Sequence, residues 1–235
     1  MKSILFIDRD GTIINEAPPT YQIDSFEKLE FYPEVFQYLS RIAEELDFEL
    51  IMVSNQDGLG TESFPEETFW PVQNFILNTL KNEGISFSNI LIDKTFKKDN
   101  LPTRKPGTAL LTNYINNPDY DLPNSYVIGD RVTDVQLAKN LGSKAIWLNN
   151  DETLGASEIN DIESLKESIA LETKSWKQIY EFLKLKTRTV HHERNTNETK
   201  ISVDLKFGRN RKSQYSYGFR LLRSYAGTNC KTWKY

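Results

Sequence analysis

The chain has 235 residues, of which 38% are hydrophobic and 26% are charged, a balance typical of a globular protein. It holds only two histidines, His191 and His192, and one cysteine, Cys230, which excludes a Ser-His-Asp triad in the first 190 residues, a Cys/His zinc site and a disulfide framework. Eight of the 29 basic residues and none of the 33 acidic ones lie in 206–235, so residues 1–205 carry a net charge of −12.

Apolar runs and segments of helical periodicity alternate along the first 150 residues. Strands are predicted at 3–7, 50–53, 90–92, 125–128 and 144–148. Helices are predicted from Pro33, over 65–83, through 110–114 and over 133–141. This alternation predicts an α/β fold, a Rossmann-like open parallel sheet with helices on both faces.

The pattern of apolar residues changes twice in the remaining chain. An amphipathic helix is expected from about 163 to 185, and 188–205 then alternates in the manner of half-buried strands. No apolar run approaches the ~20 residues of a membrane span, and the N-terminus lacks the pattern of a signal peptide. We therefore expect a cytoplasmic protein without a membrane partner.

Polar side chains follow three of the predicted strands at the point where each strand ends. Asp8 and Asp10 follow the first strand, Ser54 the second, and Asp130 the fourth. Parallel sheets bind ligands outside the C-terminal ends of their strands, so these groups are expected in one crevice. Carboxylates without His or Cys indicate a hard cation such as Mg²⁺, and Lys105 and Ser54 are suited to bind phosphoryl oxygens.

These motifs resemble the four motifs of the haloacid dehalogenase superfamily. The matching segments are Asp8-x-Asp10-Gly11-Thr12, Ser54-Asn55, Lys105 and Gly129-Asp130-x-x-x-Asp134. The resemblance covers about residues 3–148. It implies a haloacid dehalogenase fold and a phosphatase that works through an aspartyl-phosphate. The short spacing from Asp8 to Ser54 leaves room for a minimal cap only.

The resemblance also implies a role for each residue. Asp8 is the expected nucleophile, and Asp10 is the expected general acid and base. Mg²⁺ is expected on Asp8, the backbone carbonyl of Asp10 and Asp130. Lys105 is expected to neutralise charge on the transferred group. The residues expected to bind substrate are Ser54, Asn55, Gln56 and Arg104.

Other interpretations of these residues stay open at this point. Asp8 and Asp10 could be solvated turn residues, and Lys105 could be an ordinary surface lysine. Asp130 could cap the following helix, and Asp134 could cap it or support Lys105. Gln56 and Arg104 could merely orient their loop.

Within the superfamily, the sequence resembles the histidinol-phosphatase half of the bifunctional histidine-biosynthesis proteins. The segments that carry this likeness are 6–12, 55–61, 104–106 and 126–131. It implies hydrolysis of L-histidinol phosphate, a small phosphomonoester. The alternatives are a phosphatase for heptose bisphosphate or another small phosphomonoester, and a non-catalytic remnant. Those families often carry a zinc loop before the Arg-Lys motif, but 93–103 has no Cys or His, so no zinc is expected and the loop must be held by packing or be mobile.

The basic C-terminal segment is interpreted as out of frame. Residues 194–203 resemble the first strand of imidazoleglycerol-phosphate dehydratase, the other half of those bifunctional proteins, but the likeness stops at Lys206. Residues 207–211 can be encoded as TTT GGA AGG AAC CGG. Read one base later and followed by an A, these codons give Leu-Glu-Gly-Thr-Gly, which contains the Gly-Thr-Gly turn that the dehydratase family has at this place. Codons for 221–227 and 229–235 can likewise be chosen so that the same shift gives dehydratase-like segments. We hypothesise a one-base insertion near Leu205/Lys206, with no dehydratase activity and no selected nucleic-acid partner.

Four regions are expected. They are a phosphatase domain over 1–165, a connecting helix over 166–187, the first strands of a dehydratase-like domain over 188–205, and a basic, disordered tail over 206–235.

Overall fold

The computed structural model describes residues 1–150, 153–159, 161, 163–186, 189–195 and 200–206. Its contacts divide the chain into two compact units, Met1–Leu183 and Lys184–Tyr235. The boundaries of the expected domains 1–165, 166–187 and 188–205 differ from those of these two units, and the expected domains stay predictions. The tail expected to be disordered lies, from 207 on, outside the described residues.

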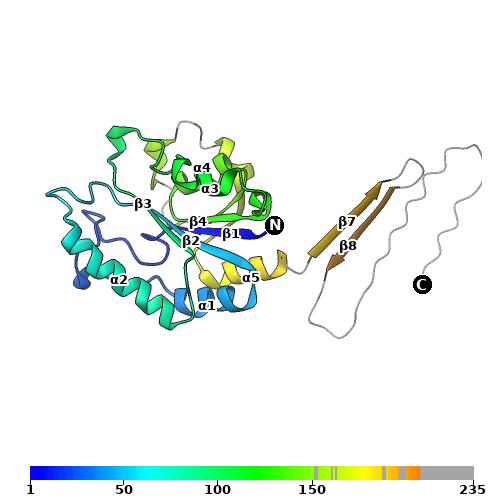
Figure 1. Cartoon of the computed structure of the whole chain (residues 1–235), viewed down its shortest axis with the longest axis horizontal. Coiled ribbons are helices and arrows are strands. Elements are labelled where there is room, and N and C mark those ends of the chain that lie inside the picture. Colours follow the sequence, from blue (N-terminus) through cyan, green and yellow to red (C-terminus); the bar gives the residue numbers. More distant parts are fainter. Residues whose placement is uncertain (151–152, 160, 162, 187–188, 196–199, 207–235) are drawn as a thin grey trace, which may run out of the picture. The chain divides into compact units, whose positions relative to one another are not determined.

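A six-stranded parallel sheet forms the centre of the first unit (Figure 1). The strands are β1 (Ser3–Ile7), β2 (Phe48–Asn55), β3 (Asn89–Asp93), β4 (Tyr126–Gly129), β5 (Lys144–Leu148) and β6 (Ile169–Thr173). They are hydrogen-bonded in the order β3-β2-β1-β4-β5-β6, and every neighbouring pair is parallel. The expected open parallel sheet is therefore confirmed.

Helices cover both faces of this sheet. They are α1 (Val35–Glu45), α2 (Glu66–Asn82), α3 (Thr112–Ile115), α4 (Val132–Leu141) and α5 (Trp176–Lys186). Short 3₁₀ turns lie at Phe26–Lys28, Lys97–Asp99, Ala109–Leu111, Leu122–Asn124, Ala156–Glu158 and Glu163–Ser168. In Figure 1, α1, α2 and α5 lie on one side of the sheet, and α3 and α4 lie on the other.

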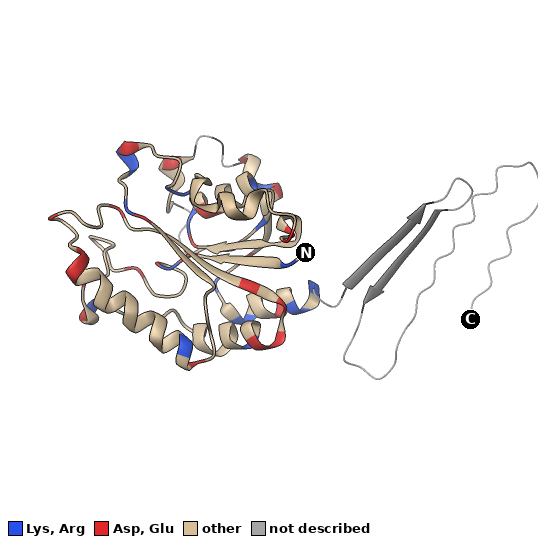
Figure 2. Ribbon diagram, in the orientation of Figure 1, with Lys and Arg blue, Asp and Glu red and all other residues tan. Residues whose placement is uncertain are grey.

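The alternation of side chains along β1 explains these two layers. Leu5 and Ile7 belong to a core cluster with residues of α1, α2 and α5, whereas Ile4 and Phe6 belong to a second cluster with residues of α3 and α4. All four side chains are fully buried, as expected for a central parallel strand with helices on both sides. Charged residues lie chiefly on the helices and loops around this core (Figure 2).

The expected continuous helix from about 163 to 185 is wrong. A 3₁₀ turn, strand β6 and helix α5 occupy this segment instead. Strand β6 pairs with β5, with Ile146 opposite Leu171 and Leu148 opposite Thr173. Backbone pairing at the edge of the sheet outweighs the helical spacing of the apolar residues.

Residues 8–47 between β1 and β2 are all described, and they form a loop with one 3₁₀ turn followed by α1. No separate domain is inserted there, in agreement with the expected minimal cap. Among the helices of the described residues, none combines the length and apolar character needed to cross a bilayer.

The second unit contains an antiparallel pair, β7 (Thr189–Asn195) and β8 (Lys200–Lys206). Its register places Thr189 opposite Lys206 and Asn195 opposite Lys200. Strands are therefore present in the segment where the alternation predicted them.

Candidate active site

The candidate site lies where the strand order reverses. Strands β1 and β4 are neighbours, but the chain passes from β1 to β2 on one side and from β4 to β5 on the other. Such a reversal leaves a crevice at the C-terminal ends of the two strands. Asp8 directly follows β1, and Asp130 directly follows β4, so the topology itself brings these two carboxylates together.

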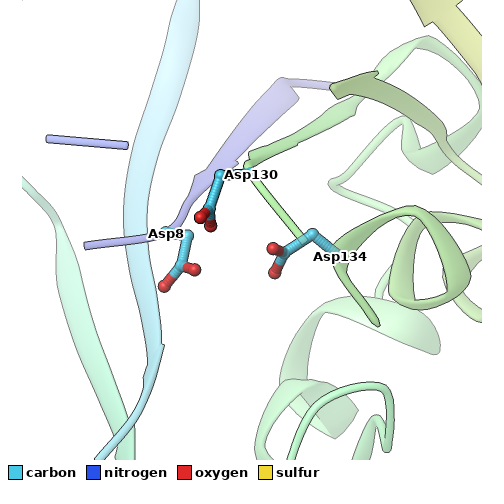
Figure 3. Close-up of side chains that lie close together, drawn as sticks. All are labelled: Asp8, Asp130 and Asp134. Atoms are coloured by element: carbon cyan, nitrogen blue, oxygen red, sulfur yellow. The ribbon is translucent and has the colours of Figure 1, made fainter. Parts of the chain in front are cut away.

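A third carboxylate, Asp134 from the first turn of α4, completes the cluster. One ligand atom from each of Asp8, Asp130 and Asp134 lies within 4.8 Å of the other two. Figure 3 shows the three side chains directed toward a common space. Their residues are 6%, 2% and 1% exposed, so solvent does little to screen the like charges.

Burial and mutual repulsion alter the acidity of this cluster. Burial raises the pKa of Asp8 to about 7, with Lys105 opposing the rise and Asp134 adding to it. Burial, followed by the charge of Asp8, also raises the pKa of Asp130 well above its usual value. In the protein alone, the positive charge near Asp8 and Asp130 is therefore too small to keep the pKa values of these carboxyl groups in their usual range.

Lys105 is the cation that lies inside the cluster. Its Nζ is 2.8 Å from Oδ1 of Asp8 and 2.8 Å from Oδ1 of Asp134. Burial alone would lower its pKa, but the carboxylates of Asp134 and Asp8 outweigh burial and raise it. Lys105 is therefore charged at neutral pH and is no surface lysine, since it is only 4% exposed.

The expected supporting role of Asp134 is present in the contacts. Its Oδ1 accepts a hydrogen bond from Lys105, and its Oδ2 accepts one from the backbone N–H of Arg131, the N-cap residue of α4. The same side chain thus fixes the start of α4 and the position of the lysine.

The backbone of Lys105 is fixed by Asn55 at the end of β2. The side-chain carbonyl of Asn55 accepts a hydrogen bond from the N–H of Lys105 at 2.9 Å, and its amide donates to the carbonyl of Lys105 at 3.2 Å. Asn55 was expected to bind substrate. The structure instead places both ends of its amide against the protein, so a substrate contact stays a prediction.

The environment of Asp130 fits a divalent cation. Its Oδ1 is buried and has no hydrogen-bond partner among the described residues. A Cβ atom at Gly11, where φ is +69°, would lie 2.1 Å from Oδ2 of Asp130, so the loop after β1 has room for no side chain at this position. A buried, unpaired carboxylate oxygen beside a second carboxylate is the donor set that Mg²⁺ prefers.

Asp10 is held differently from the other carboxylates. Its Oδ1 accepts a hydrogen bond from Nη1 of Arg9 at 2.6 Å, and its Oδ2 accepts one from Nε2 of Gln56 at 2.5 Å. The same Nε2 also lies 2.8 Å from Oγ of Ser54, so Gln56 links Ser54 to Asp10. Gln56 therefore contacts the expected acid and base, and a direct contact with substrate stays a prediction.

A cleft of about 400 Å³ opens over these residues. The residues that line its walls include Asp8, Asp10, Lys105, Arg104, Arg131 and Glu158. Nη2 of Arg104 lies 3.1 Å from Oδ2 of Asp57, and its Nη1 lies 2.6 Å from Oε2 of Glu158. Arg104 thus joins two loops of the wall, and its expected role in binding substrate stays a prediction.

The loop 93–103, which contains no Cys or His, is held by contacts within the protein. Oδ1 of Asp93 accepts hydrogen bonds from the backbone N–H of Thr95 at 2.9 Å and from its hydroxyl at 2.5 Å. The ring of Phe96 lies so close to Gly58 that a Cβ there would approach it to 2.4 Å. Of the two expected possibilities, packing rather than mobility is the one the contacts support.

Sequence reasoning missed several residues around the site. One of them is Arg9, although an arginine that lies between two motif aspartates already indicates a role at the site. The carboxylate partners of the two wall arginines were also missed: Asp57 and Glu158 for Arg104, and Glu16 for Arg131. Glu158 lies 54 residues from Arg104, and no local pattern connects them.

Comparison with known proteins agrees with this fold. The HAD-hydrolase-like family model matches residues 102–166. Among solved structures, the D,D-heptose 1,7-bisphosphate phosphatase of B. bronchiseptica, in complex with magnesium and phosphate, superposes with a TM-score of 0.65 at 21% identity. The match covers 79% of this chain and 99% of that one.

Sequence similarity is higher to a group of two-function proteins. The histidine biosynthesis bifunctional protein HisB of Bacteroides fragilis is 53% identical over 87% of this chain and 53% of its own length. The HisB protein of Spirosoma linguale is 49% identical over 92% of this chain and 58% of its own length. The chain thus spans somewhat more than half the length of these relatives. The family resemblance deduced from the motifs is confirmed.

Proposed function

We propose that this chain, a member of the haloacid dehalogenase-like hydrolases, is a phosphatase that hydrolyses L-histidinol phosphate to L-histidinol and phosphate. The observation that carries the reaction type is the buried cluster of Asp8, Asp130 and Lys105 at the strand reversal. The similarity to HisB proteins over 87% or more of the chain supports the substrate. A cytoplasmic location and a small phosphomonoester as the substrate are part of the same proposal.

Asp8 is the proposed nucleophile. Its Oδ1 accepts hydrogen bonds from the backbone N–H of Arg9 at 2.7 Å and from Lys105, which fixes the plane of the carboxylate. We assign attack on phosphorus to Oδ2. As the Asp8–phosphorus bond forms, the ester bond from phosphorus to the substrate oxygen breaks, and its electron pair leaves with that oxygen.

Asp10 is the proposed acid and base. It gives a proton to the departing oxygen and so releases the alcohol. A water molecule then attacks the phosphorus of the aspartyl-phosphate, Asp10 takes the proton of that water, and phosphate leaves with Asp8 restored. Lys105 and Ser54 are proposed to neutralise charge on the phosphoryl oxygens throughout.

Mg²⁺ is the proposed cofactor, held by Asp8, Asp130 and the backbone carbonyl of Asp10. When bound, it supplies further positive charge for the phosphoryl oxygens. The orphaned Oδ1 of Asp130 and the raised pKa of its carboxyl support a cation here. Zinc is not part of the proposal.

The test is release of inorganic phosphate from L-histidinol phosphate by the full chain, with Mg²⁺ and after its removal with EDTA. Replacing the nucleophile, Asp8→Asn, is expected to lower kcat by about 10³-fold or more. Asp47→Asn changes a 93% exposed carboxylate on the surface and should leave kcat unchanged. Equal, slow rates for wild type and Asp8→Asn would contradict an enzyme and favour the non-catalytic remnant.

The same assay with D,D-heptose 1,7-bisphosphate decides the substrate. That sugar is named for the B. bronchiseptica protein, which shares the fold. We expect kcat/KM to be at least about tenfold higher for L-histidinol phosphate, the difference that 1.4 kcal/mol of transition-state binding produces. The opposite order would reassign the substrate and keep the reaction.

A further inference from the structure

Arg9 is a charged side chain that is completely buried, with 0% of its surface exposed. Two residues of helix α2, one turn apart, hold it in place. Its Nε donates a hydrogen bond to Oε1 of Gln73 at 2.7 Å, and its guanidinium carbon lies 5.0 Å from the centre of the Phe69 ring. Gln73 and Phe69 are themselves 0% exposed, so this anchor lies wholly in the interior.

The outer end of Arg9 reaches the carboxylate of its neighbour. Nη1 contacts Oδ1 of Asp10 at 2.6 Å, whereas the buried Nη2 has no hydrogen-bond partner among the described residues. Gln56 donates to the other oxygen of Asp10. The carboxylate of Asp10, with a side chain that is 15% exposed, is thus fixed from two sides, once from the core and once from the end of β2.

Stability alone does not account for this arrangement. Removing a guanidinium from water is costly, and apolar residues of similar volume often stabilise a protein as well as a buried ion pair does. Arg9 also has an unsatisfied nitrogen, which adds to its cost. An aliphatic side chain in this pocket would avoid both penalties, so the geometry points to a use for the charge.

We propose that Arg9 is a positioning residue that, together with Gln56, orients the carboxyl group of Asp10 for proton transfer to the leaving oxygen of the substrate. This rests on the proposed phosphatase function. Each carboxylate oxygen has a second lone pair, so the hydrogen bonds from Arg9 and Gln56 still leave a place for the proton that Asp10 passes on. Fixing the plane of the carboxyl removes orientations from which that transfer fails.

The proposal makes the effect of Arg9 depend on the leaving group. An alkyl oxygen needs a proton as it departs, whereas p-nitrophenolate leaves readily without one. The experiment measures single-turnover cleavage by the full chain in excess over L-histidinol phosphate or p-nitrophenyl phosphate, because this isolates the step in which the ester bond breaks. Arg9→Met should slow the alkyl ester about 100-fold and the aryl ester less than about 5-fold, as expected for loss of general acid catalysis.

Two further variants separate positioning from folding. Arg9→Lys keeps a positive charge that can reach Asp10 but loses the planar fork, and it should recover at least about tenfold of the loss on the alkyl ester. Gln73→Leu removes the anchor of Arg9 without touching Asp10, and it should give a smaller loss with the same bias toward the alkyl ester. It also replaces Arg9→Met as the test if that variant fails to fold, as judged by circular dichroism.

The outcomes are distinct. A bias toward the alkyl ester supports the proposal when the protein concentration that half-saturates the cleavage rate changes by less than about twofold, since contacts to the phosphoryl group are then intact. Equal losses on both esters would assign Arg9 a structural role and overturn it, and so would no loss on either. If wild type and Asp8→Asn cleave both esters equally slowly, the phosphatase function itself fails and the role of Arg9 falls with it.

Discussion

Asp130 carries a carboxylate that the rest of the chain compensates only in part. It is 2% exposed, its Oδ1 lacks a partner among the described residues, and Asp8 lies beside it. The pKa of its carboxyl is raised by burial first and by Asp8 second, which means that the ionised form destabilises the folded protein without a cation. At this residue, the needs of a cation site and of stability are opposed.

Asp130→Asn should therefore stabilise the metal-free protein while removing its response to Mg²⁺. We expect its free energy of unfolding at pH 7.5 in EDTA to rise, because the amide removes a buried negative charge whose Oδ1 lacks a hydrogen-bond partner in the described part of the chain. Wild type should gain thermal stability on addition of Mg²⁺, and the variant should not. Thermal melts with and without Mg²⁺ measure both effects, and an equal gain in the two proteins would remove Asp130 from the cation site.

Asn55 gives a prediction of a different kind. Because both ends of its amide contact the backbone of Lys105, Asn55→Ala should displace the lysine and lower kcat by about tenfold to 100-fold, the cost of one or two lost hydrogen bonds. KM should change little. Asn55→Asp keeps the acceptor for the Lys105 N–H, and its kcat should lie between those of wild type and Asn55→Ala. A rise in KM at constant kcat would instead show that Asn55 binds substrate.

The motifs predicted which residues lie together at the site. They predicted less well which hydrogen-bond partner each of these residues has. Asp8, Asp130 and Lys105 do lie together, because motif spacing and strand topology determine their positions. The partners of Asn55, Gln56 and Arg104 come from loops about 50 residues away, and no local pattern encodes those contacts.

Helix α5 connects the end of the first unit to its active-site loop. Trp176 is 0% exposed, and its Nε1 donates a hydrogen bond to the backbone carbonyl of Thr12 at 3.0 Å. The periodicity of the sequence correctly indicated a helix here but extended it through β6. Apolar spacing alone cannot distinguish a short edge strand from a helical turn; the pairing of Ile169–Thr173 with β5 decides it.

Trp176→Ala should lower the free energy of unfolding by about 3–5 kcal/mol, the usual cost of emptying a large buried site. Trp176→Phe fills most of the space and should cost less. Lys177→Ala, on the exposed side of the same helix, is the matched control and should be close to neutral. Urea unfolding followed by circular dichroism measures all three; a neutral Trp176→Ala would show that α5 is dispensable for the fold.

A chain cut after residue 165 tests the expected domain boundary at the same scale. It lacks β6 and α5, and with them Trp176, Ile179 and Leu183 of the core. We expect it to remain unfolded by circular dichroism, whereas a chain cut after 186 should fold and keep phosphatase activity. A folded 1–165 fragment would restore the boundary deduced from the sequence.

The whole molecule joins a unit with a complete sheet to a segment of different composition. The chain covers 53% and 58% of the lengths of the two HisB relatives, and 207–235 contains basic but no acidic residues. This composition supports the proposal of a one-base insertion near Leu205/Lys206, although residues from 207 on lie outside the described part of the chain.

Sequencing the gene across codons 200–235 tests that proposal. We expect one base in excess near codon 206, and a dehydratase-like sequence when it is deleted. The chain as it stands should show no turnover of imidazoleglycerol phosphate. Codons that do not restore the dehydratase sequence in the shifted frame would contradict the insertion.

The close approach of Gly11 to Asp130 has a consequence for how such an enzyme can diversify. Any side chain at Gly11 collides with a carboxylate, and a Cβ at Gly129 would lie 2.3 Å from Cγ of Asp134. Positions 11 and 129 beside the carboxylate cluster thus tolerate no side chain, whereas the cleft is lined in part by loop residues such as Thr20, Gln22 and Thr153. Since loops accept substitution more readily than close-packed positions, laboratory selection for new phosphate esters should accumulate changes at those loop residues and keep both glycines.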